Sequence, residues 1–333
     1  MNLVGEHVDH QGGLVLPLAL RQGVAVAWAP RPDRAVRVLA LDAKGGDRFV
    51  HGSYVKSGRR WADLVRGACA VLEARGSRLP GLDLVIAGDV PAGKGLASSA
   101  AFVTAVLRAF FAASARDASP AGISRIVQEV EAEWAGVRCG AMDPYVAALN
   151  HPGEAILLDC RALTHEALPW PEGVEAVPID TEVTRRLSET PYNERRAEVD
   201  DAVARAKAMR PDLAGVRDMT FADFAEVEGR LPEPGRRRLR HVVTEIDRVR
   251  RGADALRRGD AAALGRVMDE GHESLSKDFQ CSTPAIDALA ASIRAQPGVL
   301  GVRLQGAGWG GCLVVLRRKP EEPAASKEAP ETS

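Results

Sequence analysis

The chain has 333 residues, which at roughly 150 residues per domain predicts about two domains, each large enough for its own core. Hydrophobic residues make up 46% and charged residues 27% of the chain, and 44 Lys and Arg against 45 Asp and Glu give a net charge of −1. This balance is typical of a soluble globular protein. It excludes a mostly disordered or collagen-like chain and a global attraction to nucleic acid or anionic membranes.

No membrane, secretion or metal-cluster feature is visible in the sequence. The longest apolar-leaning stretch, residues 97–115, carries three serines, a threonine and an arginine, so it is not predicted to span a membrane. The N-terminal MNLVGEHVDH has neither the basic nor the apolar region of a signal peptide. The five cysteines lie far apart with no Cys-x-x-Cys pair, which argues against a zinc site or disulfide framework. We therefore expect a cytoplasmic monomer with no nucleic-acid or membrane partner.

The first half of the chain, to about Leu168, alternates short β-rich runs with helical stretches. Strands are predicted at residues 13–17, 24–28, 35–41 and 82–87, which are bounded by Gly, Pro and Asp. Helices are predicted at residues 60–75, 97–115 and 124–134 from their apolar spacing, and the serines that open the second helix are suited to capping.

The second half is almost wholly helical from about residue 194 to 295, with breaks at Pro211, Pro232 and Pro234. Residues 299–304 and 312–316 then predict a strand, a glycine-rich turn and another strand. The last residues, 319–333, hold no large apolar side chain and are expected to form a disordered tail. The fold class is therefore α+β, with the mixed half first.

Two glycine-rich segments match nucleotide-binding patterns only superficially. Residues 88–94 fit the start of a P-loop, but Gly95 replaces the Ser or Thr that would hold magnesium, and Pro91 removes a backbone N–H. Residues 306–311 fit G-x-G-x-x-G, but a strand follows where a dinucleotide fold needs a helix.

A different phosphate-binding element remains at residues 93–101, where glycines follow a strand and serines open a helix. The glycines allow close approach of an anion, and the free N–H groups and dipole of the helix favour phosphate. The hydroxyls of Ser98 and Ser99 could bind a phosphate oxygen or a magnesium ion. The alternative is an ordinary glycine turn with serine N-caps.

Three segments in order resemble the signatures of one enzyme family. NLVGEHVDHQGG at residues 2–13 resembles the first signature of galactokinases, and PAGKGLASSA at residues 91–100 is similar to the phosphate-binding motif of the wider GHMP small-molecule kinases. LQGAGWGGC at residues 304–312 is similar to their C-terminal motif. Between them, CGAMD at residues 139–143 is similar to the segment that carries the catalytic aspartate. Further matches are LDCRAL at 158–163, YNERR at 192–196 and HESLSKD at 272–278.

The resemblance implies a two-domain GHMP kinase fold. The first domain, residues 1–168, would be the ribosomal-protein-S5-like ATP-binding domain, and residues 169–318 would be the ferredoxin-like helical C-terminal domain. ATP and sugar would meet in the cleft between them. The implied reaction is transfer of the γ-phosphoryl group of ATP to the anomeric hydroxyl of galactose, with ATP and Mg²⁺ as cofactors.

The resemblance also assigns site residues. Asp143 would accept the proton of the sugar hydroxyl, although an Asp at this position could otherwise serve as a helix cap. Ser99 and Glu131 would be the magnesium ligands, because a hydroxyl and a carboxylate are hard oxygen donors. For Glu131 the alternative is a solvated helix face, since Glu129 and Glu133 lie nearby.

The remaining assignments concern the sugar and the nucleotide. The sugar ligands would be Glu6, His7, Asp9, Gly140 and Tyr192, with an exposed turn as the alternative for the first three. The nucleotide would be bound by Trp61, Gly93, Gly95, Ser98, Ser99 and Gly308, although Trp61 could instead belong to a helix core. Cys139 and Cys312 are expected to be small packing residues.

The chain departs from the galactokinase pattern in two places. His10 and Gln11 stand where common galactokinases have Tyr and Asn, and DHQGG also resembles uronic-acid kinases. The arginine that precedes the first motif in the family has no counterpart, nor have the strand and hairpin before it. We expect an incomplete or impaired form whose start was assigned too late, with an open sheet edge along residues 13–25 and Arg185 as the candidate replacement. The competing functions are a kinase for galacturonate or another sugar and a catalytically weak sugar sensor.

Overall fold

The structure is a computed structural model, and it describes residues 1–183 and 190–320. Its strands are β1 (Asn2–Val4), β2 (Leu14–Pro17), β3 (Val24–Arg31), β4 (Ala35–Ala40), β5 (Gly45–Val50), β6 (Gly81–Gly88), β7 (Ala155–Asp159), β8 (Thr164–Leu168), β9 (Val174–Asp180), β10 (Val299–Leu304) and β11 (Cys312–Arg318). Its α-helices are α1 (Arg60–Ala74), α2 (Ser98–Ala113), α3 (Pro120–Ala135), α4 (Met142–Leu149), α5 (Tyr192–Met209), α6 (Phe221–Val227), α7 (Gly235–Arg257), α8 (Ala261–Ser274) and α9 (Pro284–Arg294). Within the described ranges, no helix is both long and apolar enough to cross a membrane.

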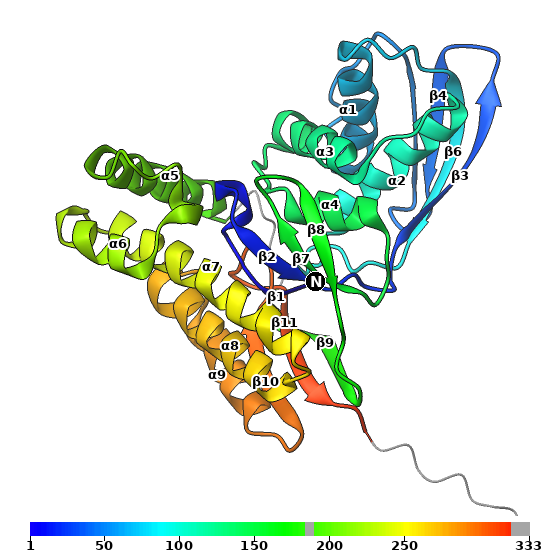
Figure 1. The fold of residues 1–333 in the computed structure, drawn as a ribbon. Coiled ribbons are helices and arrows are strands. Elements are labelled where there is room, and N and C mark those ends of the chain that lie inside the picture. Colours follow the sequence, from blue (N-terminus) through cyan, green and yellow to red (C-terminus); the bar gives the residue numbers. More distant parts are fainter. Residues whose placement is uncertain (184–189, 321–333) are drawn as a thin grey trace, which may run out of the picture.

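A four-stranded sheet in the order β3-β6-β4-β5 forms one end of the molecule (Figure 1). Alternating residues of its strands, such as Val36 and Val38 of β4, are buried against α1, α2 and α3. The apolar stripes of these helices, with Leu64 and Val103 among them, complete a separate hydrophobic core. α3 begins four residues before its predicted start because Ser119 caps it and Pro120 occupies its first turn.

A second sheet in the order β1-β2-β7-β8 lies at the centre of the molecule (Figure 1). β2 pairs with β1 on one side and with β7 on the other. The open edge expected along residues 13–25 is therefore wrong for β2. Within residues 13–25, the open sheet edge lies in β3, which among the described strands pairs with β6 alone.

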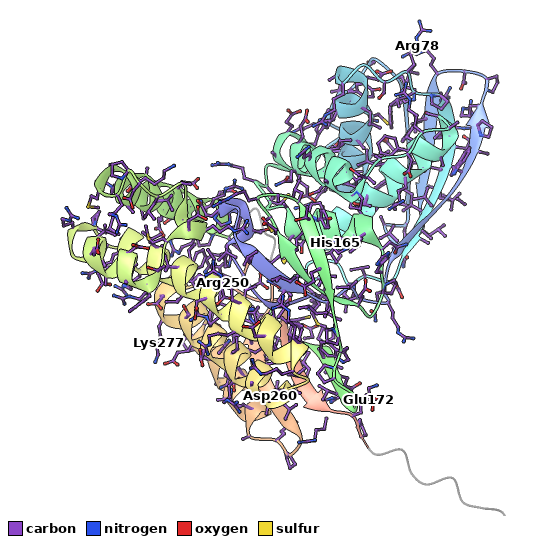
Figure 2. The ribbon with its side chains drawn as sticks, in the orientation of Figure 1. Arg78, His165, Glu172, Arg250, Asp260 and Lys277 are labelled. Carbon is purple, nitrogen blue, oxygen red and sulfur yellow. The ribbon has the colours of Figure 1, made fainter. Side chains whose placement is uncertain are left out.

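The third sheet, in the order β10-β11-β9, is covered by α8 and α9. α7 packs against β1 and β2, and α8 packs against β1. One large hydrophobic cluster joins the two halves of the chain. It contains residues of the N-terminal half, such as Val15 and Leu158, and residues of α7 and β11, such as Val242 and Leu313. Figure 2 shows His165 of β8 near the middle of the molecule, with Arg78 at one end and Asp260 and Glu172 at the other.

Candidate active site

A cavity of about 670 Å³ opens between the first motif, the phosphate-loop segment and the N-terminal ends of α2 and α4. This volume lies within the range of roughly 300–1,000 Å³ that is usual for small-molecule sites. The sequence-predicted residues that line it are Glu6, His7, Asp9, Gly93, Gly95, Ser98, Ser99, Glu131, Gly140, Asp143 and Tyr192. Segments from both halves of the chain therefore meet in one site.

The start of α2 leaves its serines available to a ligand. Ala97 precedes the helix with φ +62° and makes no side-chain cap, so Ser98 and Ser99 stand in the first turn itself. The expectation that the serines cap this helix is wrong. Because no side chain satisfies the first N–H groups of α2, they and the serine hydroxyls can receive an anion at the cavity wall.

Ser99, Glu131 and Arg60 come together on one side of the cavity. Glu131 on α3 is only 4% exposed, so the solvated-face interpretation of this residue is wrong. Burial raises the pKa of Glu131, and the nearby Ser99 hydroxyl and Arg60 guanidinium oppose that shift. The Ser99 hydroxyl is buried, and no described residue lies in hydrogen-bonding geometry with it. Arg60 Nη2 lies 3.9 Å from Glu131 Oε2.

These oxygen donors fit a hard divalent cation that takes its remaining ligands from a polyphosphate. Mg²⁺ is commonly held by one or two protein oxygens together with substrate phosphates. Within residues 1–183 and 190–320, no group of three or more His, Cys, Asp or Glu side chains could hold a metal by itself. The serine hydroxyl and the buried carboxylate could therefore hold such an ion only together with oxygen ligands from a bound molecule or water.

Asp143 lies in the first turn of α4, where its carboxyl faces the cavity. Ala141, and not Asp143, occupies the N-cap position, so the helix-cap interpretation is wrong. Burial raises the pKa of Asp143 to about 7, the Met1 amino group opposes this shift, and the charges of Glu6, Asp9 and Glu131 add to it. A carboxyl group with this pKa can both hold and release a proton at neutral pH.

Glu6 connects the first motif with the glycine-rich turn after β10. Its side chain is 3% exposed, and Oε1 accepts a hydrogen bond of 2.8 Å from the backbone N–H of Gly306. Burial raises the pKa of Glu6, while Arg303 and this hydrogen bond oppose the shift. The exposed-turn alternative is therefore wrong for Glu6.

Asp9 and Gly140 are in direct contact across the cavity wall. A Cβ atom added at Gly140 would lie 1.8 Å from Asp9 Oδ2, so only glycine leaves room for this carboxylate. Asp9 Oδ1 accepts a hydrogen bond of 2.9 Å from the backbone N–H of His10, and Oδ2 lies 3.4 Å from the N–H of Met142. The carboxylate is thus aimed at the start of the helix that carries Asp143.

His7 belongs to a cluster of aromatic rings beside the carboxylates. Its imidazole stacks on Phe279 with ring centroids 4.0 Å apart and lies 5.9 Å from the ring of Tyr192. The side chain is buried, so the exposed-turn alternative fails here as well. Rings and carboxylates together form the surface that a polyhydroxyl ligand can use for stacking and hydrogen bonding.

Two residues assigned to the nucleotide lie outside the cavity lining. Trp61 packs with the core of the β3-β6-β4-β5 sheet and lies beneath the guanidinium of Arg59, 5.3 Å from its ring centroid. Gly308 packs against Cys281, whose backbone oxygen would lie 2.4 Å from a Cβ added there. Their nucleotide roles remain predictions, and Arg185 lies outside the described residues.

The sequence reasoning missed several residues of the cavity. Arg60 is the only Lys or Arg among the described lining residues. Its position directly before Trp61, at the start of a predicted helix, could have indicated in the sequence that it belongs to the site. Cys139 also lines the cavity and is half-buried, whereas Cys312 is a core residue as expected. Of the departures from the family pattern, Gln11 donates a 2.6 Å hydrogen bond to Asp200 of α5.

Comparisons with known proteins agree with this geometry. Residues 63–151 match the model of the GHMP kinases N terminal domain, residues 253–331 that of the GHMP kinases C terminal domain, and residues 1–30 the galactokinase galactose-binding signature. A galactokinase of Roseiflexus sp. (strain RS-1) is 41% identical over 316 residues, which cover 95% of this chain and 81% of that protein. A galactokinase of Chloroflexus aggregans is 38% identical over 317 residues, with the same coverage of 95% and 81%.

Solved structures show the same relationship. The crystal structure of Lactococcus lactis galactokinase complexed with galactose superposes with a TM-score of 0.90 at 28% identity, covering 95% of this chain and 83% of that chain. The Methanococcus jannaschii mevalonate kinase, at 17% identity and a TM-score of 0.64 over 95% and 88% of the two chains, shares the fold. The chain has the two-domain GHMP kinase fold and belongs to the galactokinase family.

Proposed function

We propose that this chain transfers the γ-phosphoryl group of ATP to the anomeric hydroxyl of galactose. The observation that carries this proposal is the single cavity in which Glu6, Asp9 and Asp143 face the uncapped start of α2. A sugar held by the first motif and a triphosphate held at α2 would meet beside Asp143. The kinship with galactokinases at 38–41% identity supports the same sugar.

Asp143 is the proposed base. Its carboxylate accepts the proton of the anomeric hydroxyl while the hydroxyl oxygen attacks the γ-phosphorus and ADP leaves. The pKa of about 7, raised by burial and by the neighbouring carboxylates, supports a proton transfer near neutral pH. The proposed sugar-binding residues line the same cavity as Asp143; they are Glu6, His7, Asp9, Gly140 and Tyr192.

ATP binding is proposed at residues 93–99, with Ser99 and Glu131 holding Mg²⁺. Bound there, the ion would neutralise negative charge on the phosphate oxygens. The charge of the site supports the need for a metal cation. Four carboxyl groups line the cavity, a triphosphate would add further negative charge, and Arg60 is the only Lys or Arg among the described lining residues. Arg60 is the proposed protein cation nearest to the phosphates.

A neutral sugar suits the cavity better than a uronate. Glu6, Asp9 and Asp143 would each oppose a substrate carboxylate, and like charges brought together without water cost several kcal/mol. A hydroxymethyl group can instead donate a hydrogen bond to a carboxylate oxygen. This comparison favours galactose over galacturonate despite the DHQGG segment.

The proposal also covers domains and location. We retain the division into residues 1–168 and 169–318, since the two domain matches lie on opposite sides of residue 168. One chain supplies every residue named for the reaction, so a monomer suffices. Free thiols at Cys69, Cys139, Cys160 and Cys312 and the need for ATP support a cytoplasmic enzyme.

A coupled assay of ADP release across a sugar panel tests the proposal. We expect galactose to give the highest kcat/KM and phosphorus NMR to show the phosphate on the anomeric oxygen. Asp143→Asn should lower kcat by about 10²–10⁴-fold, as expected for loss of a positioned base, and leave ATP binding near the wild-type value. Faster turnover of galacturonate, or unchanged turnover in the variant, would reject the assignment.

A further inference from the structure

The backbone of the sugar-binding motif is held from behind by a buried polar cluster. This anchoring cluster consists of His241, Glu245 and Arg248 on α7 and Arg303 on β10, and none of the four lines the cavity. Three of its members, His241, Glu245 and Arg303, hydrogen-bond backbone atoms of residues 3–6 across more than 230 positions of sequence, and Arg248 pairs with Glu245. The proposed function leaves them unused.

Glu245 is the charged centre of the anchoring cluster. Its Oε1 accepts hydrogen bonds from the backbone N–H of Gly5 at 2.7 Å and of Glu6 at 3.2 Å, and Oε2 accepts from Arg248 Nε at 2.7 Å. Although burial opposes it, the charges of Arg248 and Arg303 hold the pKa of Glu245 well below its usual range. The carboxylate is thus a permanent acceptor that satisfies two peptide donors where β1 has ended.

His241 holds the carbonyl of the same peptide segment. Its Nε2 lies 3.0 Å from the Glu6 oxygen, and its Nδ1 lies 2.9 Å from Ser274 Oγ. Burial lowers the pKa of His241 to about 4, so the ring is neutral at physiological pH and carries one proton. A carbonyl can only accept, so this proton must be on Nε2, and Nδ1 accepts from the Ser274 hydroxyl.

The same imidazole also supports the next residue of the motif. The ring of His241 lies 5.0 Å from that of Phe279, and Phe279 stacks on His7. His241 therefore fixes the peptide oxygen of Glu6 and, through Phe279, one face of the His7 ring. Both of these residues enter the cavity, while His241 itself is fully buried behind them.

We propose that His241 is a positioning residue for the sugar, because its Nε2–H fixes the direction in which Glu6 and His7 enter the cavity. The inference rests on the proposed function, since it names what orients the sugar-binding side chains. The phosphate loop receives no hydrogen bond from His241, so sugar binding should depend on this contact and nucleotide binding should not.

Two isosteric substitutions separate this role from general packing. In His241→Gln the amide nitrogen can take the place of Nε2 and still donate to the Glu6 oxygen. In His241→Asn the shorter amide reaches only to the place of Nδ1, so the donor is lost. We expect His241→Asn to raise the KM for galactose about tenfold, the effect of one hydrogen bond, with the KM for ATP changed less than about twofold. His241→Gln should recover most of the galactose affinity.

Thermal unfolding of the full chain with each ligand gives a readout that does not depend on turnover. At one fixed galactose concentration, the sugar should raise the Tm of His241→Asn less than that of the wild type and of His241→Gln, because a tenfold weaker ligand stabilises the folded state less. ATP with magnesium should raise the Tm of all three by the same amount. Equal responses of the two variants to galactose would overturn the positioning role. A wild type that neither binds nor phosphorylates galactose would instead overturn the proposed function.

Should His241→Asn fail to fold, Ser274→Ala provides a second test. The one proton of the Ser274 hydroxyl has two acceptors within reach, His241 Nδ1 at 2.9 Å and Asp278 Oδ2 at 3.2 Å. We assign this proton to Nδ1, because the imidazole proton is on Nε2, and donation from the Ser274 hydroxyl then keeps it there. Removal of the Ser274 hydroxyl brings the two neutral tautomers of His241 closer in free energy, so that Nε2 carries the proton less often. The KM for galactose should therefore rise about threefold while the KM for ATP stays constant. A constant KM for both substrates would contradict the proposal.

Discussion

Four carboxyl groups, those of Glu6, Asp9, Glu131 and Asp143, share the cavity with Arg60 as the only described lining residue of Lys or Arg type. Burial raises the pKa values of Glu6, Glu131 and Asp143, and the proximity of the groups adds to the shift at Asp143. These carboxyl groups create a negative electrostatic potential in the cavity, which a bound cation or the hydroxyl donors of a sugar can reduce. This crowding supports the proposed acid–base role of Asp143.

The pH dependence of the reaction should report Asp143. The pKa of this group is about 7, so below pH 7 its carboxyl is mostly protonated and cannot accept a proton. We expect kcat/KM for galactose, measured at saturating ATP, to rise about tenfold per pH unit below pH 7 and to level off above it. A flat profile between pH 5.5 and 8.5 would contradict this role.

The contact between Gly140 and Asp9 allows a second residue-scale prediction. In Gly140→Ala the new methyl group would lie 1.8 Å from Asp9 Oδ2, so the carboxylate must move out of its place. We expect the KM for galactose to rise at least about tenfold with the KM for ATP little changed. Gly229→Ala is the control, because its Cβ meets nothing within 4 Å. Equal kinetics for the two variants would show that the position of Asp9 does not matter.

At the scale of elements, the glycine-rich turn between β10 and β11 supports the phosphate loop. Gln305 Nε2 donates a 3.2 Å hydrogen bond to the Gly95 oxygen, and its Oε1 accepts from the Asn2 N–H at 2.8 Å. A Cβ added at Gly306 would lie 3.0 Å from that same Gly95 oxygen. One turn thus touches both the first motif and the loop that would bind phosphate.

The turn can be tested with glycines in similar backbone conformations. Gly306 has φ +69° and faces Gly95, whereas Gly298 has φ +81° and meets only the Arg318 Cβ at 4.0 Å. Alanine at either position should cost about 1 kcal/mol of folding free energy from the left-handed backbone alone. Only Gly306→Ala should also raise the KM for ATP, since only its methyl group displaces the phosphate loop. A higher KM for ATP in Gly298→Ala would contradict this assignment.

The elements that could be predicted from sequence are those whose pattern is local. The spacing of Leu64, Val65 and Ala68 predicts α1 to within one residue, and the break at Pro234 predicts the start of α7. α4 and β7 to β9 were not predicted, because the secondary structure of these short apolar segments depends on the elements that pack against them. Motifs identified most of the cavity lining, but Arg60 and the anchoring cluster depend on contacts between distant segments.

At the scale of the whole molecule, the central sheet links the two halves of the chain. β1 and β2 lie against α7, β1 also lies against α8, and one hydrophobic cluster contains residues from Val8 to Val315. Separate unfolding of the halves would expose this shared surface to water, which is strongly unfavourable.

Calorimetry should therefore show a single unfolding transition of the full chain. Galactose should shift the whole transition to higher temperature, because a ligand held by the central segment stabilises everything that unfolds with it. The check is a scan at several protein concentrations with and without the sugar. Two resolved transitions, only one of them moved by galactose, would show that the halves unfold independently.

The long-range anchoring of the first motif also governs when the enzyme can become active during its synthesis. Glu6 is synthesised 235 residues before His241 and 300 residues before Gly306, the two residues that hydrogen-bond it, and Arg303, whose charge acts on its carboxyl group, also follows late. The β3-β6-β4-β5 sheet and its helices have their own core and can fold on the nascent chain. A message that stops before β10 would therefore give a product with a phosphate loop and Asp143 but with Glu6 lacking two of the groups that hold it.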